Sequence, residues 1–76
     1  MKILILSIYD CAYGFDAMII TDDSALHLPQ NKIDEWESRY MTGDQSLMES
    51  AFQQGYDRLI ICEDGCIRYY DKNQKN

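Results

Sequence analysis

The sequence predicts a single α+β domain, in which a four-stranded, mostly antiparallel sheet of order ββααββ carries two short helices on one face. Three observations predict this class. An apolar run opens the chain, two amphipathic stretches occupy its middle, and an Asp-Gly turn joins two apolar runs near its end. With 76 residues, of which 46% are hydrophobic, the chain can build one small core. We expect the compact domain over residues 1–71 and a frayed tail over residues 72–76.

The first strands follow from the apolar pattern. Residues 2–9 are apolar at nearly every position, which is typical of a strand buried on both faces in the middle of a sheet. A loop is expected over residues 10–16 and a second strand over residues 17–21. The acidic sequence 22–24 ends that strand. The segment 25–30 holds the only His and the only Pro, has no clear period, and is interpreted as a connection.

Two helices are expected next. Asn31 can cap the first helix, and Asp34 and Glu35 fall in its first turn, where the helix dipole favours negative charge. Its apolar positions recur at helical spacing; they are Ile33, Trp36, Tyr40 and Met41. The sequence 42–44 breaks this helix, and Gly55 stands where a glycine commonly ends a helix. The apolar stripe of the second helix is Leu47, Met48, Ala51 and Phe52.

The stretch from Arg58 to Asp71 predicts a β-hairpin closed by Asp64-Gly65, because these residues tolerate the positive φ that a two-residue loop requires. The expected cross-strand pairs are Glu63–Cys66, Cys62–Ile67, Ile61–Arg68, Ile60–Tyr69, Leu59–Tyr70 and Arg58–Asp71. One face of the hairpin then carries the apolar set Ile60, Cys62, Ile67 and Tyr69. We expect this apolar face, including Tyr69, to point into the core.

The charge balance excludes some classes of partner. Thirteen acidic residues and seven basic ones give a net charge of −6, which repels phosphate backbones and anionic membrane surfaces. Direct nucleic-acid binding is therefore disfavoured. No apolar run approaches the roughly 20 residues of a membrane-spanning helix, and the apolar start is better explained as a strand than as a signal peptide.

The cysteines favour a reducing compartment. Cys11, Cys62 and Cys66 are odd in number, and the hairpin register puts Cys62 and Cys66 on opposite faces, so these two are not expected to form a disulfide. We expect a cytoplasmic protein of a bacterial cell, with a phage gene as one source.

The residue pattern gives little indication of a catalytic site. Acids follow three expected strands, at Asp10, at Asp22-Asp23 and at Glu63-Asp64, and could hold a divalent cation for hydrolysis if they shared one edge. Antiparallel neighbours would separate them. His27 has no partner at a spacing that predicts acid–base work, and Cys62-x-x-x-Cys66 lacks the second ligand pair of a zinc site. We expect no enzymatic activity, no cofactor and no metal.

The distribution of acids points to a basic protein partner. We expect a small inhibitor that blocks a nucleic-acid-binding protein by electrostatic competition, by analogy of size and charge with the anti-CRISPR and anti-restriction proteins of phages and mobile elements. Exposed aromatic side chains are expected at Tyr13, Phe15 and Tyr70. The residues expected to bind the partner are Tyr13, Phe15, Asp22, Asp23, Asp34, Glu35 and Glu37.

Three alternatives remain open at this point. Acidity could serve only to keep a small protein in solution. The chain could be a homo-oligomeric structural or regulatory module, for example a homodimer that pairs through an exposed strand edge. The less favoured third alternative is a metal-dependent hydrolase built on the acids at the strand ends.

Overall fold

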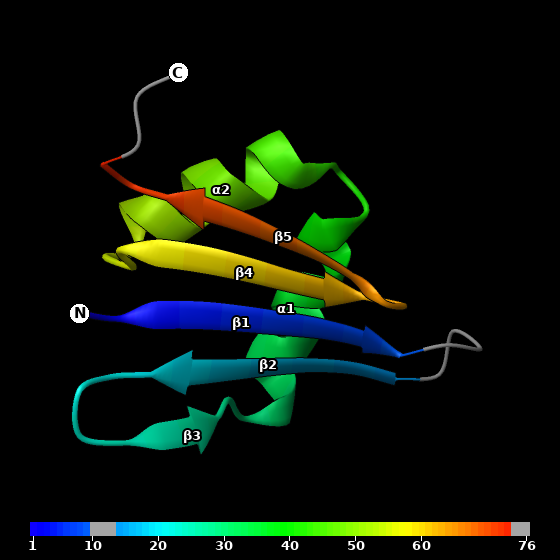
Figure 1. Cartoon of the computed structure of the whole chain (residues 1–76). Coiled ribbons are helices and arrows are strands. Elements are labelled where there is room, and N and C mark those ends of the chain that lie inside the picture. The colour runs from blue at the N-terminus through cyan, green and yellow to red at the C-terminus, as the bar shows by residue number, and fades with distance from the viewer. Residues whose placement is uncertain (10–13, 74–76) are drawn as a thin grey trace.

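The protein has two layers, a five-stranded sheet and a pair of helices that lie behind it in Figure 1. The computed structural model describes residues 1–9 and 14–73. Along the chain the elements are β1 (Ile3–Tyr9), β2 (Gly14–Ile20), β3 (Ala25–His27), α1 (Gln30–Tyr40), α2 (Asp44–Gln53), β4 (Arg58–Glu63) and β5 (Cys66–Asp71). In space the strands lie in the order β3-β2-β1-β4-β5. The predicted α+β class is confirmed, but the sheet has five strands instead of four.

The additional strand is β3, which pairs antiparallel with β2 at one edge of the sheet. The prediction of an irregular connection here was wrong, because the turn before β3 sets up the pairing. The backbone N–H of Thr21 donates to the carbonyl oxygen of Ser24 at 2.9 Å, and the Thr21 hydroxyl oxygen accepts from the Ser24 N–H at 3.2 Å. A strand of three residues is too short for an alternating pattern to be visible in the sequence.

Strand β1 lies at the centre of the sheet, as predicted. It pairs antiparallel with β2, where Ile3 lies opposite Ile20, and parallel with β4, where Ile3 lies opposite Arg58. Parallel neighbours need a long connection, and β2, β3 and both helices supply it. The start of β2 at Gly14 is three residues earlier than expected.

Helix α1 begins one residue before the predicted cap. Pro29 occupies the N-cap position without a side-chain hydrogen bond, and its carbonyl oxygen accepts from the N–H groups of Lys32 and Ile33. Capping by Asn31 and an acidic first turn were therefore wrong. Ile33 and Trp36 are buried and Tyr40 packs against the core, as expected, but Met41 is 80% exposed because it follows the last helical residue.

Helix α2 agrees with the prediction. Leu47 and Ala51 are buried, and Met48 and Phe52 pack against the core. Gly43 precedes the helix with a φ of 103°, and Gly55 follows it with a φ of 94°, so both use backbone conformations that favour glycine.

The β4–β5 hairpin has the predicted register at all six pairs, and Asp64 and Gly65 adopt positive φ in the turn. The face predicted to be inside was wrong. Leu59 and Ile61 are fully buried toward the helices, whereas Ile67 and Tyr69, from the other face, are 53% and 63% exposed. The predicted face was wrong because the buried face also carries Arg68, whose charge is compensated by Glu63 on the neighbouring strand and by Asp44 on α2.

The core fills the space between the sheet and the helices. Its buried residues are Leu4, Leu6, Ala17, Ile33, Trp36, Leu47, Ala51, Tyr56, Leu59 and Ile61. The rings of Trp36 and Tyr56 meet edge to face, with centroids 6.3 Å apart. Burial of these apolar side chains between the two layers stabilises the fold.

The other side of the sheet, called the open face from here on, is covered by no element of the described part of the chain (Figure 1). Alternate residues of the five strands form it: Ile3, Ile5, Ser7, Tyr9, Gly14, Asp16, Met18, Ile20, Ala25, His27, Arg58, Ile60, Cys62, Ile67, Tyr69 and Asp71. None of these belongs to the buried core cluster. The predicted burial of β1 on both faces is thus met on one face only.

Two leucine substitutions should separate the two kinds of surface. Leu6→Ala removes a fully buried side chain from the central strand and should lower the free energy of unfolding by about 3 kcal/mol. Leu26→Ala makes the same chemical change on β3, where the side chain is 64% exposed, and should cost less than about 1 kcal/mol. Urea unfolding of both variants measures the difference, and equal losses would contradict this core.

Candidate functional site

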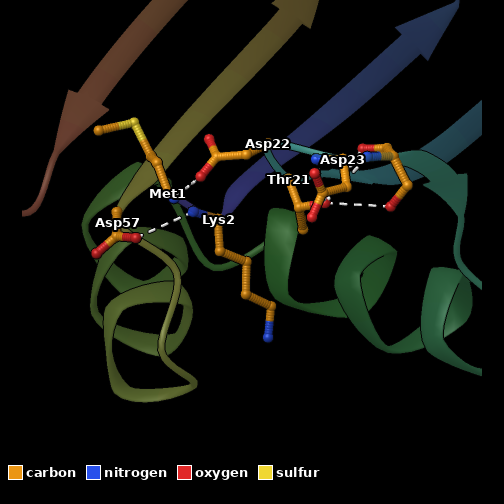
Figure 2. A network of polar contacts seen from close by, with 7 residues as sticks. Met1, Lys2, Thr21, Asp22, Asp23 and Asp57 are labelled. Atoms are coloured by element: carbon orange, nitrogen blue, oxygen red, sulfur yellow. Dashed lines mark hydrogen bonds and ion pairs between the residues drawn. The ribbon is translucent and has the colours of Figure 1, made fainter.

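The acidic turn between β2 and β3 holds Asp22 and Asp23, both exposed (Figure 2). A carboxylate oxygen of Asp22 lies 3.2 Å from the N-terminal ammonium of Met1. The Thr21 hydroxyl oxygen accepts the backbone N–H of Asp23 at 3.4 Å and shapes the turn. Asp23 forms no ion pair with any described residue. The turn therefore offers one partly neutralised carboxylate and one unpaired one.

Hydrogen bonds hold the start of β1 in place next to this turn (Figure 2). The Lys2 N–H donates to a carboxylate oxygen of Asp57 at 3.0 Å, and the Asp57 N–H donates to the Lys2 carbonyl oxygen at 2.8 Å. The Lys2 ammonium lies 4.6 Å from the centre of the Tyr56 ring. Burial raises the pKa of Tyr56 above its ordinary value of 10.0, so its hydroxyl stays neutral.

The three acids predicted on the first helix are exposed on α1. Asp34 accepts a hydrogen bond from the Gln30 amide at 2.8 Å, and Glu35 pairs with Lys32 at 3.1 Å. Glu37 has no ion-pair partner among residues 1–9 and 14–73. Of the three, Glu37 is the least compensated.

A hollow brings together two residues that the sequence singled out separately. It has a volume of about 230 Å³, and its lining comprises Ile8, Gly14, Phe15, Glu37, Tyr40 and Met41. We call it the β2–α1 hollow, because the start of β2 and the end of α1 form most of it. Phe15 and Glu37 thus share one site. Asp22 and Asp23 are not in the lining of this hollow.

Three aromatic side chains were predicted to be exposed, and the two that the structure describes are not. Phe15 was expected to be exposed, but its ring is half-buried, packs on the core and lies 5.9 Å from the Tyr40 ring. Tyr70 is likewise half-buried instead of exposed, because it lies on the helix side of β5. Tyr13 lies outside the described residues. The exposed aromatic side chains of the described sheet are Tyr9 and Tyr69.

A polar network that the sequence did not predict ties β5 to the helices. The Arg68 guanidinium donates to Asp44 at 2.6 Å and to Glu63 at 3.0 Å. The Tyr70 hydroxyl donates to Asp44 at 2.6 Å, and the Tyr40 hydroxyl donates to Glu63. All five residues are half-buried, so one cation and two phenols satisfy two carboxylates whose side chains are 29% and 34% exposed.

Three members of this network, Asp44, Arg68 and Tyr70, have shifted pKa values. Burial acts to raise the pKa of Asp44, but the hydrogen bonds from Arg68 and Tyr70 outweigh it and hold that pKa below its ordinary value of 3.8. The hydrogen bond to Asp44 is the main cause of a raised pKa at Tyr70. Hydrogen bonds to Asp44 and Glu63 raise the pKa of Arg68 further. Such shifts stabilise an ion pair and do not poise a general acid or base near neutral pH.

The acids at the strand ends are divided between the two ends of the sheet. Because β1 is antiparallel to β2 and parallel to β4, Asp22-Asp23 lies at one end and Glu63-Asp64 at the other. Asp10 lies outside the described residues. Within the described residues, no group of three or more His, Cys, Asp or Glu is arranged to hold a metal ion.

The other residues considered for chemistry have ordinary surroundings. His27 lies on the open face, with its Nδ1 atom 2.9 Å from a carboxylate oxygen of Asp16. Cys62 lies on the open face and Cys66 on the helix side of the hairpin, as the predicted register requires.

Neither helix of the described chain has the length and apolar character needed to cross a membrane.

Comparisons of the chain with protein-family models, with curated proteins and with solved structures found no match.

The Arg68 network gives a stability prediction. Arg68→Met keeps much of the apolar stem but leaves the Asp44 and Glu63 carboxylates without their cation, and should lower the free energy of unfolding by about 2 kcal/mol at neutral pH. Lys32→Met, the control, removes only the exposed ion pair with Glu35 and should cost about 0.5 kcal/mol. Urea unfolding measures both. A loss at Arg68 no larger than that at Lys32 would show that the network contributes nothing.

Acid should weaken the same network. Since the pKa of Asp44 is lower in the folded protein than its ordinary 3.8, the stability it contributes is complete above about pH 4 and is lost as pH falls through the folded pKa. Arg68→Met removes much of the cause of that shift, so its stability should fall less steeply on acidification. Urea unfolding at a series of acidic pH values tests this, and parallel curves for the two proteins would contradict it.

Proposed function

We propose that this chain is a non-enzymatic, acidic protein-binding inhibitor that covers the basic surface of a nucleic-acid-binding protein. The observation that carries the proposal is the β2–α1 hollow, whose lining includes both an aromatic ring, Phe15, and a carboxylate without an ion-pair partner among the described residues, Glu37. The hollow opens beside an acidic helix. An aromatic surface beside a free carboxylate suits a lysine or arginine side chain better than a phosphate.

The chemistry of the hollow supports recognition of one long basic side chain. Its volume of about 230 Å³ lies below the roughly 300 Å³ at which pockets for drug-sized ligands begin. The methylene groups of a lysine or arginine would pack against Phe15 and the exposed Met41, while the charged end would reach Glu37. Such a contact removes a basic side chain of the partner from the phosphates that it normally binds.

The remaining exposed acids support long-range attraction. Asp22 and Asp23 lie in the β2–β3 turn, and Asp34 and Glu35 lie on α1, so negative charge extends well beyond the hollow. With a net charge of −6, the chain attracts basic surfaces and repels free nucleic acid. CRISPR effectors and restriction enzymes have basic nucleic-acid grooves of this kind, and we propose an effector of such a defence system as the target class.

A pair of charge reversals tests the proposal. Glu37→Lys changes the hollow, whereas Glu49→Lys makes the same change in charge at an exposed site on α2. Tagged wild-type protein and Glu49→Lys should capture a nucleic-acid-binding protein from bacterial lysate and release it as salt rises. Glu37→Lys should bind the same protein about tenfold more weakly, because its ammonium repels the incoming basic side chain.

The captured protein then serves in a competition assay with labelled DNA or RNA. Wild-type protein should displace the nucleic acid, and Glu37→Lys should require a higher concentration to do so. Equal displacement by all three proteins would refute the role of the hollow. Capture that is insensitive to salt would refute electrostatic competition altogether.

A further inference from the structure

The open face of the sheet has the composition of a core layer. The register places Met18, Ile5, Ile60 and Tyr69 in one row across four adjacent strands, and His27 continues that row onto β3. A mixed sheet with a solvated face normally alternates between apolar residues inside and polar residues outside. Here both faces of β1 and β4 are apolar, although only one is covered.

The rows on either side extend this apolar surface. Ile20 and Ile3 lie next to the central row at one end of the sheet, and Cys62 and Ile67 lie next to it at the other. Ile67 is more than half exposed, as is Tyr69 in the central row. A contiguous apolar patch of this extent is typical of an interface and is unusual on a surface that stays in water.

The open face carries little of the net charge of the molecule. Its acidic and basic side chains are Asp16, Arg58 and Asp71. Arg58 pairs with Asp71 at 3.2 Å, so Asp16 is the one carboxylate of this face without a lysine or arginine partner among the described residues. The other exposed acids lie in the β2–β3 turn, on the helices and at the hairpin turn. Two copies that each carry a net charge of −6 can therefore meet here with the least repulsion.

The area suits a weakly bound second copy. Five strands of three to seven residues, about 4.8 Å apart and with about 3.3 Å per residue along them, give a face of about 460 Å² in projection. Two such faces bury about 900 Å² before the roughness of the side chains is counted, which corresponds to a small, weak interface. Sheets that pack face to face in this way form the core of β-sandwiches.

We propose that two copies of this chain form a two-fold symmetric dimer by packing their open faces against each other. A two-fold axis brings the same residues of both copies together, so one apolar face can supply both halves of the interface. Tyr69 projects from this face, because its side chain is 63% exposed. This dimer leaves the helices and the β2–α1 hollow on the outside, so it does not depend on the proposed function.

Sedimentation velocity over a range of concentrations tests the dimer. The wild-type protein should sediment as a dimer that dissociates in the micromolar range. Ile5→Glu places a charge at the centre of the face and should give a monomer. Tyr69→Lys, at a side chain exposed enough not to disturb the fold, should weaken dimerisation at least about tenfold. Met41→Lys, at an exposed apolar residue after α1, is the control and should leave the dimer intact.

Thiol labelling locates the interface. Cys62 lies on the open face, whereas Cys66 is exposed at the end of the hairpin on the helix side. Labelling by a maleimide, read by mass spectrometry of the peptides, should be slow at Cys62 in the wild-type dimer and fast in the Ile5→Glu monomer. Labelling at Cys66 should be equally fast in both proteins.

Three outcomes would overturn the proposal. A wild-type protein that stays monomeric at every concentration would show that a different partner, or water, covers the open face. A dimer that survives both Ile5→Glu and Tyr69→Lys, with folding confirmed by circular dichroism, would place the interface elsewhere, for example at the exposed edge of β5. Equal labelling of Cys62 in dimer and monomer would exclude face-to-face packing.

Discussion

The position of β1 between β2 and β4 is the constraint on which the rest of the structure depends. Leu4 and Leu6 of this strand are fully buried, and the parallel register aligns them with Leu59 and Ile61 of β4. This apolar strip needs a cover, and the connection that a parallel pair requires provides it in the form of α1 and α2. The other strands extend the sheet outward from this pair, and β1 itself contributes Ile8 to the β2–α1 hollow and Ile5 to the open face.

Local patterns in the sequence were sufficient to predict much of the fold. The Asp-Gly turn determined the register of the β4–β5 hairpin, since turn geometry and register are coupled over a few residues. The stripe on α2 and the central place of β1 also followed from composition and period. Each of these features depends on residues that are close together in the chain.

The predictions that were wrong concern features that depend on contacts between residues far apart in the sequence. The hairpin turned its Leu59 face inward because Asp44, 24 residues before Arg68, compensates the charge that this face brings with it. Hydrophobicity alone favoured the opposite face. Likewise, composition identified Phe15 and Glu37 one by one, but their meeting in one hollow requires the end of α1 to pack beside the start of β2. The network of Arg68 with two acids and two tyrosines corresponds to no recognisable pattern in the sequence, so it could not be predicted.

The parallel pairing of the first strand with the fourth has a consequence for synthesis. Ile3 pairs with Arg58, so a growing chain cannot complete the centre of the sheet until β4 has left the ribosome. Until then one edge of β1 has no partner and its apolar side chains have only a partial cover. A chain that stops before β4 would present this edge to other nascent chains, so premature termination in this gene would yield an aggregation-prone fragment instead of a smaller folded protein.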